Sequence, residues 1–222
     1  MTETIVLVHS PLVGPATWQP VAEVLRQGGH RVVVPSLLDA ITPPYHRNFA
    51  TAATDGVTGT AIVVGHSGAG VLLPAIAATL DVRAAVFVDA VLPHPGTSWF
   101  ATVSAELREQ VAGMVEDGHL PPWHTWFPTE MLDRLLPDPD VRHRIVAEIP
   151  RVPAAYFDEP ASEARLSPTV RCAYVRLSHA YDDETAEAER HGWWVRRVDM
   201  DHLAIVTRPE PIANLIIEAC TS

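Results

Sequence analysis

The residues Ala61-Ile62-Val63-Val64-Gly65-His66-Ser67-Gly68-Ala69-Gly70 are the most informative part of the sequence, because an apolar run ends abruptly at a serine flanked by glycines. A continuous run of apolar, β-branched residues is typical of a buried parallel strand. The small residues of 69–80 predict a helix packed against that strand. Ser67 is therefore expected on a tight strand-to-helix turn, in a strained conformation that tolerates only small neighbours. Backbone N–H groups at the start of that helix would favour a developing negative charge.

On both sides of this turn strands and helices alternate along the chain, which indicates an α/β fold with six mostly parallel strands flanked by helices. The strands are predicted at 4–9, 31–34, 60–64, 83–89, 170–177 and 194–198. Residues 93–168 show no strand-like alternation and contain many prolines, so they are expected to form an inserted helical cap with helices at 98–116, 129–136 and 141–148. The 222 residues are thus predicted to be one domain, 1–222, with its core in 1–92 and 169–222.

The site is expected at the carboxyl ends of the strands, as in other open α/β sheets. The residues that follow those ends are Ser10-Pro11, Ser67, Asp89, the 178–183 segment and the 199–202 segment.

Residues 65–69, Gly-His-Ser-Gly-Ala, resemble the nucleophile elbow Gly-x-Ser-x-Gly of the α/β-hydrolase superfamily, with alanine in place of the last glycine. The competing interpretation is a phosphate-binding loop, which requires a Gly-Lys-Ser/Thr ending or a Gly-x-Gly-x-x-Gly spacing, and neither is present. The opening Val-Leu-Val-His at 6–9, Trp18 and the Gly-His-Ser are similar to those of small cofactor-independent esterases and hydroxynitrile lyases. The resemblance covers 4–90 and 170–219 and implies the α/β-hydrolase fold.

A serine nucleophile needs a base to take its proton and a carboxylate to orient that base. The resemblance implies a base from the loop after the last strand, where this chain has His202. The resemblance most often places the acid a few residues beyond the fifth strand, but in this chain that position holds Ala180. Asp182 and Asp183 are close to it, but both are expected in the first turn of the next helix, where carboxylates are common for structural reasons. Haloalkane dehalogenases place the acid after the strand that follows the elbow, where this chain has Asp89. We favour Asp89 and keep Asp182 and Asp183 as alternatives.

The oxyanion hole needs two backbone donors. Gly68, which follows the serine, is expected to supply one. The resemblance places the second on the loop after the first strand, at Pro11, which has no N–H, so Leu12 is the expected donor instead. Aromatic residues of the cap would wall a site for an apolar substrate, and the residues predicted to line it are Pro11, Trp123, Trp126 and Phe127.

Composition narrows the choice of partners. The formal net charge of −11 argues against nucleic acid and anionic membranes, both of which need clustered Lys and Arg. The eleven histidines lack metal-ligand spacing, so neither a metal nor another cofactor is expected. Cys172 and Cys220 are predicted to be buried thiols and not a disulfide. The N-terminal residues do not have the pattern of a signal peptide, so a cytoplasmic location is expected. Oligomeric state stays open.

These observations predict a serine hydrolase that cleaves a small, mostly apolar ester, thioester or lactone through an acyl-enzyme on Ser67. One alternative is a lyase or cyclase that uses Ser67 and His202 for acid–base chemistry, which the proline in the oxyanion loop would suit. Another is a ligand-binding module without catalysis.

Overall fold

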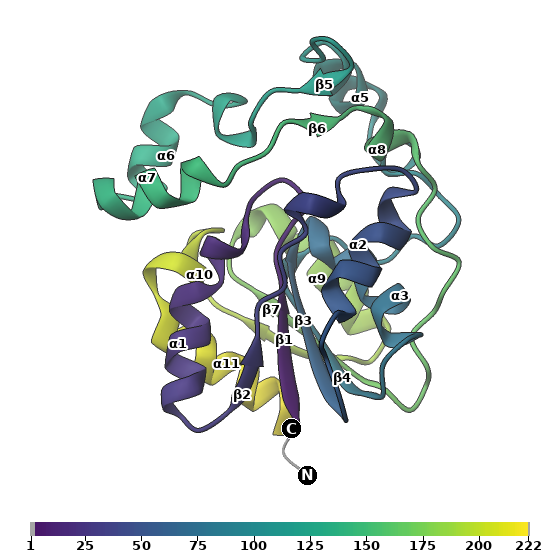
Figure 1. Cartoon of the computed structure of the whole chain (residues 1–222), viewed down its shortest axis with the longest axis vertical. Helices are drawn as coiled ribbons and strands as arrows, with labels where there is room; N and C mark the ends of the chain where they lie inside the picture. The colour runs from purple at the N-terminus through teal and green to yellow at the C-terminus, as the bar shows by residue number, and fades with distance from the viewer. Residues whose placement is uncertain (1–2, 222) are drawn as a thin grey trace.

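A computed structural model describes residues 3–221 and shows a six-stranded parallel sheet at the centre of the molecule (Figure 1). The strand order is β2-β1-β3-β4-β7-β8. The strands are β1 (Thr4–Val8), β2 (Arg31–Val33), β3 (Ala61–Ser67), β4 (Val82–Ala90), β7 (Arg171–Arg176) and β8 (Trp194–Arg197). The α/β fold class predicted from the sequence is therefore confirmed.

Helices cover both faces of the sheet, so the central strands are buried on both sides and read as continuous apolar runs (Figure 1). One face is covered by α1 (Gln19–Gln27), α10 (Ala204–Thr207) and α11 (Pro209–Thr221). The other is covered by α2 (Tyr45–Thr54), α3 (Leu73–Ala77) and α9 (Asp182–Arg190). Four 3-10 helices lie in the loops of this part: η1 (Pro15–Thr17), η2 (Leu38–Ala40), η3 (Gly68–Leu72) and η5 (His179–Tyr181).

Alternate residues of the strands feed two apolar clusters. Ile5 and Leu7 of β1 face α1 and α11, whereas Val6 and Val8 face α2 and α3. Because both clusters are anchored on the same central strands, the carboxyl ends of β1, β3, β4 and β7 are held on a rigid frame.

The segment between β4 and β7, residues 91–170, leaves the sheet and lies above the carboxyl ends of its strands; we refer to it as the cap segment (Figure 1). Its elements are α4 (Trp99–Thr102), α5 (Ala105–Ala112), β5 (His119–Leu120), η4 (Trp123–Thr125), α6 (Thr129–Leu135), α7 (Pro139–Ala147), β6 (Val152–Pro153) and α8 (Ala155–Asp158). Within this segment β5 and β6 form a short antiparallel pair.

Two helix predictions were wrong in detail. The predicted helix 98–116 is broken, because Val103 is extended and Ser104 caps a new helix by accepting a hydrogen bond from the Leu107 N–H. The predicted helix 69–80 is instead a 3-10 turn, η3, followed by the short α3.

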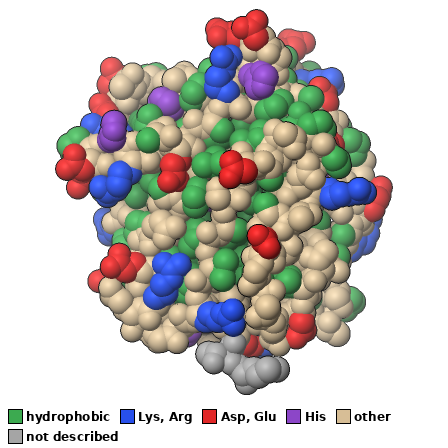
Figure 2. Space-filling model, viewed as in Figure 1, with side chains coloured by type: hydrophobic (Ala, Val, Ile, Leu, Met, Phe, Trp, Pro, Cys, Tyr) green, Lys and Arg blue, Asp and Glu red, His purple; other side chains and the backbone are tan. Residues whose placement is uncertain are grey.

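On the face shown in Figure 2, acidic and basic side chains are interspersed among apolar ones and do not gather into one charged patch. Within residues 3–221, no helix is both long and apolar enough to cross a membrane.

Candidate active site

Ser67 lies at the junction of β3 and η3, with backbone angles of φ 56° and ψ −127°. A positive φ strains a residue with a side chain, and such strain persists only where the surroundings hold it. A Cβ at Gly70 would overlap the carbonyl oxygen of Val91, so the turn requires glycine there. Ala69, which stands at the last glycine of the elbow pattern, is fully buried without such a conflict. The requirement for a small residue thus falls most strictly on position 70.

Asp89 lies beside the serine at the end of β4. Along the β3–β4 ladder His66 pairs with Val88 and Ser67 pairs with Ala90, so Asp89 is an extra residue in a bulge. Its φ of 44° is a second strained position, and its side chain is fully buried. The bulge turns the carboxylate toward the loop that carries His202.

His202 and Asp89 are hydrogen-bonded, with 2.8 Å between His202 Nδ1 and Asp89 Oδ2. A carboxylate only accepts, so the bond places the imidazole proton on Nδ1 and leaves Nε2 free to take a proton.

The loop after β7 completes the surroundings of Asp89. Asp89 Oδ1 accepts hydrogen bonds from the backbone N–H groups of Leu177 (2.7 Å) and Ser178 (3.0 Å), and Oδ2 accepts from the Ser178 hydroxyl (2.6 Å). Burial alone would raise the pKa of Asp89, but the bonds from His202 and Ser178 outweigh it and hold the pKa below its usual value. The group is therefore a carboxylate at neutral pH.

His66 fixes the backbone of the same loop. Its Nε2 donates to the carbonyl oxygen of His202 at 2.9 Å, and the two rings lie 4.4 Å apart. Burial, and secondarily the neighbouring His202, lowers the pKa of His66 to about 3. His66 therefore stays neutral and serves as a fixed donor.

The hydroxyl of Ser67 has a partner that the sequence did not predict. Ser67 Oγ lies 3.3 Å from the hydroxyl of Tyr181, a residue of η5. The ring of Tyr181 stacks on the ring of His202, with 5.1 Å between centroids and 10° between planes. The sequence feature that could have pointed to Tyr181 is its position in the 178–183 segment, which follows the end of a strand.

The predicted oxyanion donors, Gly68 and Leu12, lie where the loop after β1 meets the elbow. The Leu12 N–H donates to Ser10 Oγ at 3.3 Å. A Cβ at Gly68 would lie 3.0 Å from the same oxygen, so the loop after β1 approaches the elbow closely. As the first residue of η3, Gly68 has an N–H that no residue of that helix can accept.

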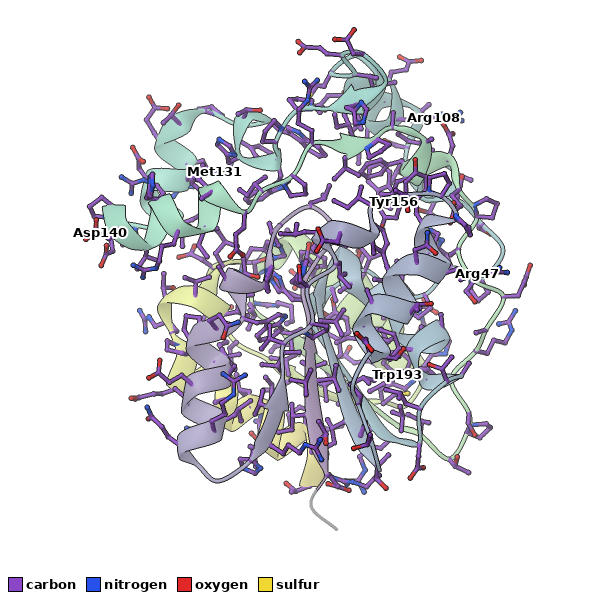
Figure 3. The ribbon with its side chains drawn as sticks, viewed as in Figure 1. Arg47, Arg108, Met131, Asp140, Tyr156 and Trp193 are labelled. Carbon is purple, nitrogen blue, oxygen red and sulfur yellow. The ribbon has the colours of Figure 1, made fainter. Side chains whose placement is uncertain are left out.

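A cavity of about 390 Å³ opens over Ser67 and His202. The residues predicted to line it all do so, namely Pro11, Trp123, Trp126 and Phe127. Its lining also includes residues that were not predicted to line it: Trp99, Met131, Leu135, Tyr156 and Phe157. Met131 comes from α6 and Tyr156 from α8, two separate helices of the cap segment (Figure 3). Because most of the lining is apolar, the cavity suits an apolar ligand.

Comparison with known protein families gives a match over nearly the whole chain. Residues 5–215 match the model of the alpha/beta hydrolase family. The chain belongs to the alpha/beta hydrolase family.

Solved structures of similar fold accompany this family match. An extracellular alpha/beta-hydrolase from a Paenibacillus species, described as sharing structural and functional homology with tobacco salicylic acid binding protein 2, is 18% identical with a TM-score of 0.78, covering 99% of this chain and 100% of that chain. A pyrethroid hydrolase from Sphingobium faniae JZ-2 is 17% identical with a TM-score of 0.72, covering 100% and 98%. Tomato methylketone synthase I is 16% identical with a TM-score of 0.72, covering 98% and 97%. At these identities the likeness shows the fold. A comparison with curated proteins finds no match.

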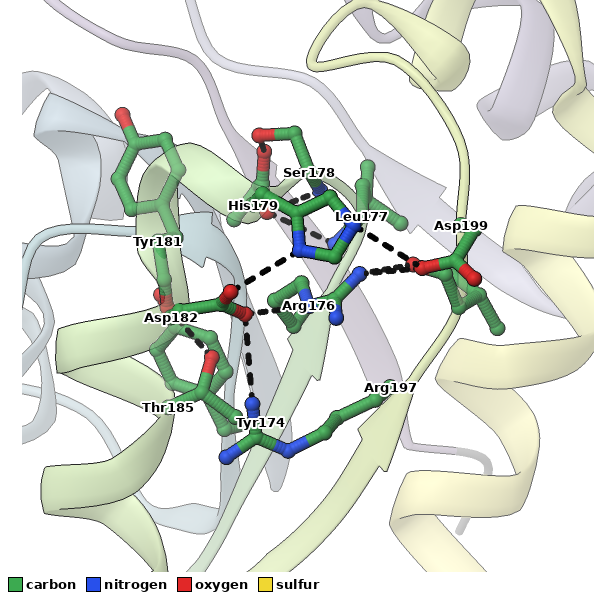
Figure 4. Close-up of polar contacts among 12 residues, drawn as sticks. Tyr174, Arg176, Leu177, Ser178, His179, Tyr181, Asp182, Thr185, Arg197 and Asp199 are labelled. Atoms are coloured by element: carbon green, nitrogen blue, oxygen red, sulfur yellow. Dashed lines mark hydrogen bonds and ion pairs between the residues drawn. The ribbon is translucent and has the colours of Figure 1, made fainter.

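The alternative carboxylates of this hydrolase-family chain lie elsewhere. Asp182 pairs with Arg176 at 2.9 Å and with His179 at 3.0 Å, in a charged network that also includes Arg197 and Asp199 (Figure 4). Asp183 is exposed in the first turn of α9. The carboxylate that the structure brings to His202 is that of Asp89.

Among residues 3–221, no three His, Cys, Asp or Glu side chains are placed so that they could hold a metal ion together.

Proposed function

We propose that this member of the alpha/beta hydrolase family is a serine hydrolase that cleaves a small, mostly apolar ester, thioester or lactone. The observation that carries the proposal is the Asp89–His202 hydrogen bond beside Ser67, at the floor of an apolar cavity.

In the proposed reaction Ser67 Oγ attacks the carbonyl carbon while His202 Nε2 takes its proton. Asp89 holds the tautomer that makes this transfer possible. The carbonyl oxygen gains negative charge and accepts hydrogen bonds from the Gly68 N–H and the Leu12 N–H. For this the Leu12 N–H must first break its hydrogen bond to Ser10 Oγ. The carbon–oxygen or carbon–sulfur bond then breaks, His202 gives its proton to the leaving group, and water hydrolyses the acyl-enzyme by the same steps.

The aromatic walls define the proposed substrate class. Trp99, Trp123, Trp126 and Phe127 surround the cavity, and flat or branched apolar groups fill such a space well. Its volume of about 390 Å³ suits a small molecule.

The test is the intact mass of the protein after exposure to a fluorophosphonate, with the labelled peptide mapped. A single adduct on Ser67, lost in His202→Ala, supports the proposal. Absence of the adduct on folded protein contradicts the acyl-enzyme.

A lyase or cyclase is the second candidate, because Pro11 has no N–H and the Leu12 N–H is already bonded to Ser10. A weak oxyanion hole would suit acid–base chemistry by Ser67 and His202. This candidate predicts turnover without a covalent adduct. A binding module without catalysis instead predicts that Ser67→Ala leaves ligand affinity unchanged.

A cytoplasmic location is part of the proposal, because Cys172 and Cys220 are free thiols. The Paenibacillus structure is described as extracellular, so cell fractionation decides between the two compartments.

A further inference from the structure

Tyr181 contacts both side chains that the proposed reaction uses for proton transfer. Its hydroxyl lies 3.3 Å from Ser67 Oγ, and its ring is stacked on His202. His66 lies against His202 as well, at 4.4 Å between centroids. The imidazole is thus held by two aromatic rings, and one of them carries a hydroxyl that reaches the reacting atom.

We propose that Tyr181 is a further catalytic residue, whose hydroxyl donates a hydrogen bond to the leaving-group oxygen as the substrate's carbon–oxygen bond breaks. This inference rests on the proposed hydrolase function and adds one donor to it.

The sheet topology determines which part of the substrate Tyr181 faces. In the strand order β1-β3-β4-β7, the loop after β1 and the η5 turn after β7 lie on opposite sides of β3, which carries Ser67. The proposed oxyanion donors, Gly68 and Leu12, lie on the β1 side. Tyr181 lies on the β7 side, with its ring stacked on His202. The leaving group must depart toward His202 because His202 protonates it. Tyr181 therefore faces the leaving group and not the oxyanion.

The protonation state of Tyr181 suits a donor. Burial raises the pKa of its hydroxyl well above the usual value, and the charges of Asp89 and Glu184 raise it further, against the opposing effect of Ser67. The phenol is therefore neutral at physiological pH. It cannot replace His202 as the base, and it supplies a hydrogen bond that strengthens as the departing oxygen gains charge.

The bonds and protons balance without a new co-reactant. The Ser67 Oγ–carbon bond forms, the bond from carbon to the leaving oxygen breaks, and the proton of Ser67 reaches that oxygen through His202. The proton of Tyr181 stays on Tyr181 throughout. In the resting protein the same hydroxyl is bonded to Ser67, so it changes partner from the nucleophile to the leaving group.

The surrounding structure holds Tyr181 in this place. Its N–H donates to the Ser178 carbonyl at 3.2 Å, and its own carbonyl accepts from Thr185 Oγ1 at 2.5 Å. Ser178 is in turn bonded to Asp89. In Figure 4 the hydroxyl of Tyr181 points away from the charged network around Asp182. The turn that presents Tyr181 is thus tied to the carboxylate that orients His202.

The experiment compares Tyr181→Phe with the wild type on esters that share one acyl group and differ in the leaving group, from p-nitrophenol through phenol to ethanol. A basic leaving group needs the donor most. We expect kcat/KM to fall about threefold for the p-nitrophenyl ester and about 30-fold for the ethyl ester, the value of a hydrogen bond to a charged oxygen. A loss of the same size for every leaving group would overturn the proposal, since a residue that only packs affects all esters alike.

Tyr174→Phe is the matched control. Tyr174 is buried on β7, and its hydroxyl is bonded to the backbone of Ala90. Its removal should leave the dependence on the leaving group as in the wild type, and a steeper dependence in this variant would also overturn the assignment to Tyr181.

Labelling of Ser67 by a fluorophosphonate separates the two hypotheses. If the wild type is not labelled, the hydrolase proposal fails. If wild type and Tyr181→Phe are both labelled and their dependence on the leaving group is equal, only the role of Tyr181 fails. Should Tyr181→Phe not fold, replacement of Tyr181 by 3-fluorotyrosine keeps the ring and makes the hydroxyl a stronger donor. That protein should lose less activity than the wild type as the leaving group becomes more basic, and an unchanged dependence would contradict the proposal.

Discussion

The substitution Asp89→Asn tests the proposed Ser67–His202–Asp89 site at the side chain that has the most hydrogen bonds. Asp89 Oδ1 accepts from two backbone N–H groups, of Leu177 and Ser178, and these donors cannot turn away. The asparagine must therefore keep its carbonyl oxygen at the Oδ1 position and place its NH₂ at the Oδ2 position, 2.8 Å from His202 Nδ1. Two donors cannot face each other, so His202 must move its proton to Nε2.

An imidazole with its proton on Nε2 cannot accept the proton of Ser67. The wrong tautomer costs serine hydrolases about 10⁴-fold in kcat, or about 5 kcal/mol of barrier. We expect that loss here in the hydrolysis of a p-nitrophenyl ester, with circular dichroism showing that the variant is folded.

Asp182→Asn and Asp199→Asn are the matched controls, because both carboxylates bind Arg176 and neither is bonded to His202. Each should keep kcat within about threefold of the wild type. If Asp89→Asn kept kcat within tenfold while Asp182→Asn lost more than a hundredfold, Asp89 would not be the acid.

Three further predictions follow from other parts of the structure. Burial lowers the pKa of His9 to about 4 and that of His66 to about 3, whereas both have a pKa near 6.5 in the unfolded chain. Protons therefore bind the unfolded chain preferentially as the pH falls. The free energy of unfolding should decrease by about 2 kcal/mol for each histidine between pH 7 and pH 5. Urea denaturation at both pH values measures this, and in His9→Gln the fall should be about 2 kcal/mol smaller than in the wild type; an undiminished fall would contradict the role of His9. Trp126→Ala should lower kcat/KM about tenfold for an ester with a bulky aromatic acyl group and change it less than about twofold for an acetyl ester, because Trp126 lines the cavity; equal losses would argue that Trp126 does not contact the acyl group. Arg176→Met should lower kcat about tenfold, because Arg176 joins the loops that carry Tyr181 and His202, and kcat equal to that of the wild type would show that the loops hold without it.

The elbow could be predicted from the sequence because its signals are local. A strand buried on both faces must be apolar throughout, and a turn this tight must have small neighbours around Ser67. Both constraints act within ten residues, 61–70, so they are visible as a pattern in the amino-acid sequence. The need for glycine at 70 was not visible, since it comes from the carbonyl oxygen of Val91 on the neighbouring chain segment.

The contact between Asp89 and His202 could not be settled from the sequence because it depends on strand order and on the bulge. Asp89 and His202 are far apart in the chain, and they meet only because β4 lies between β3 and β7 and because Asp89 is an unpaired extra residue. From the sequence Asp89 was favoured, but Asp182 and Asp183 remained alternatives. Their placement in and next to the charged network of Arg176 could not be seen before the fold was known.

The cap segment was the least predictable part. Its strands β5 and β6 are two residues long, too short for an alternating pattern to show. Its break at Val103 depends on the capping hydroxyl of Ser104, which competes with a continuous helix. The aromatic residues of this segment could be proposed as a wall, but which of them face the cavity depends on these breaks.

The place of the proposed acid, Asp89, explains how Tyr181 comes to the site. The family resemblance most often places the carboxylate beyond the fifth strand of the sheet, here β7, where it would occupy the loop beside His202. Here that loop supplies donors, because the N–H groups of Leu177 and Ser178 and the Ser178 hydroxyl all bind the carboxylate of Asp89, which arrives from β4. Since the loop does not have to present an acid to the imidazole, its next turn can lay the ring of Tyr181 against His202 and its hydroxyl against Ser67. An acid on β4 and a tyrosine on the β7 loop are therefore parts of one arrangement. Moving the acid back, by Asp89→Asn together with Ala180→Asp, should restore little activity, because an aspartate at 180 would enter a turn shaped by the ring of Tyr181.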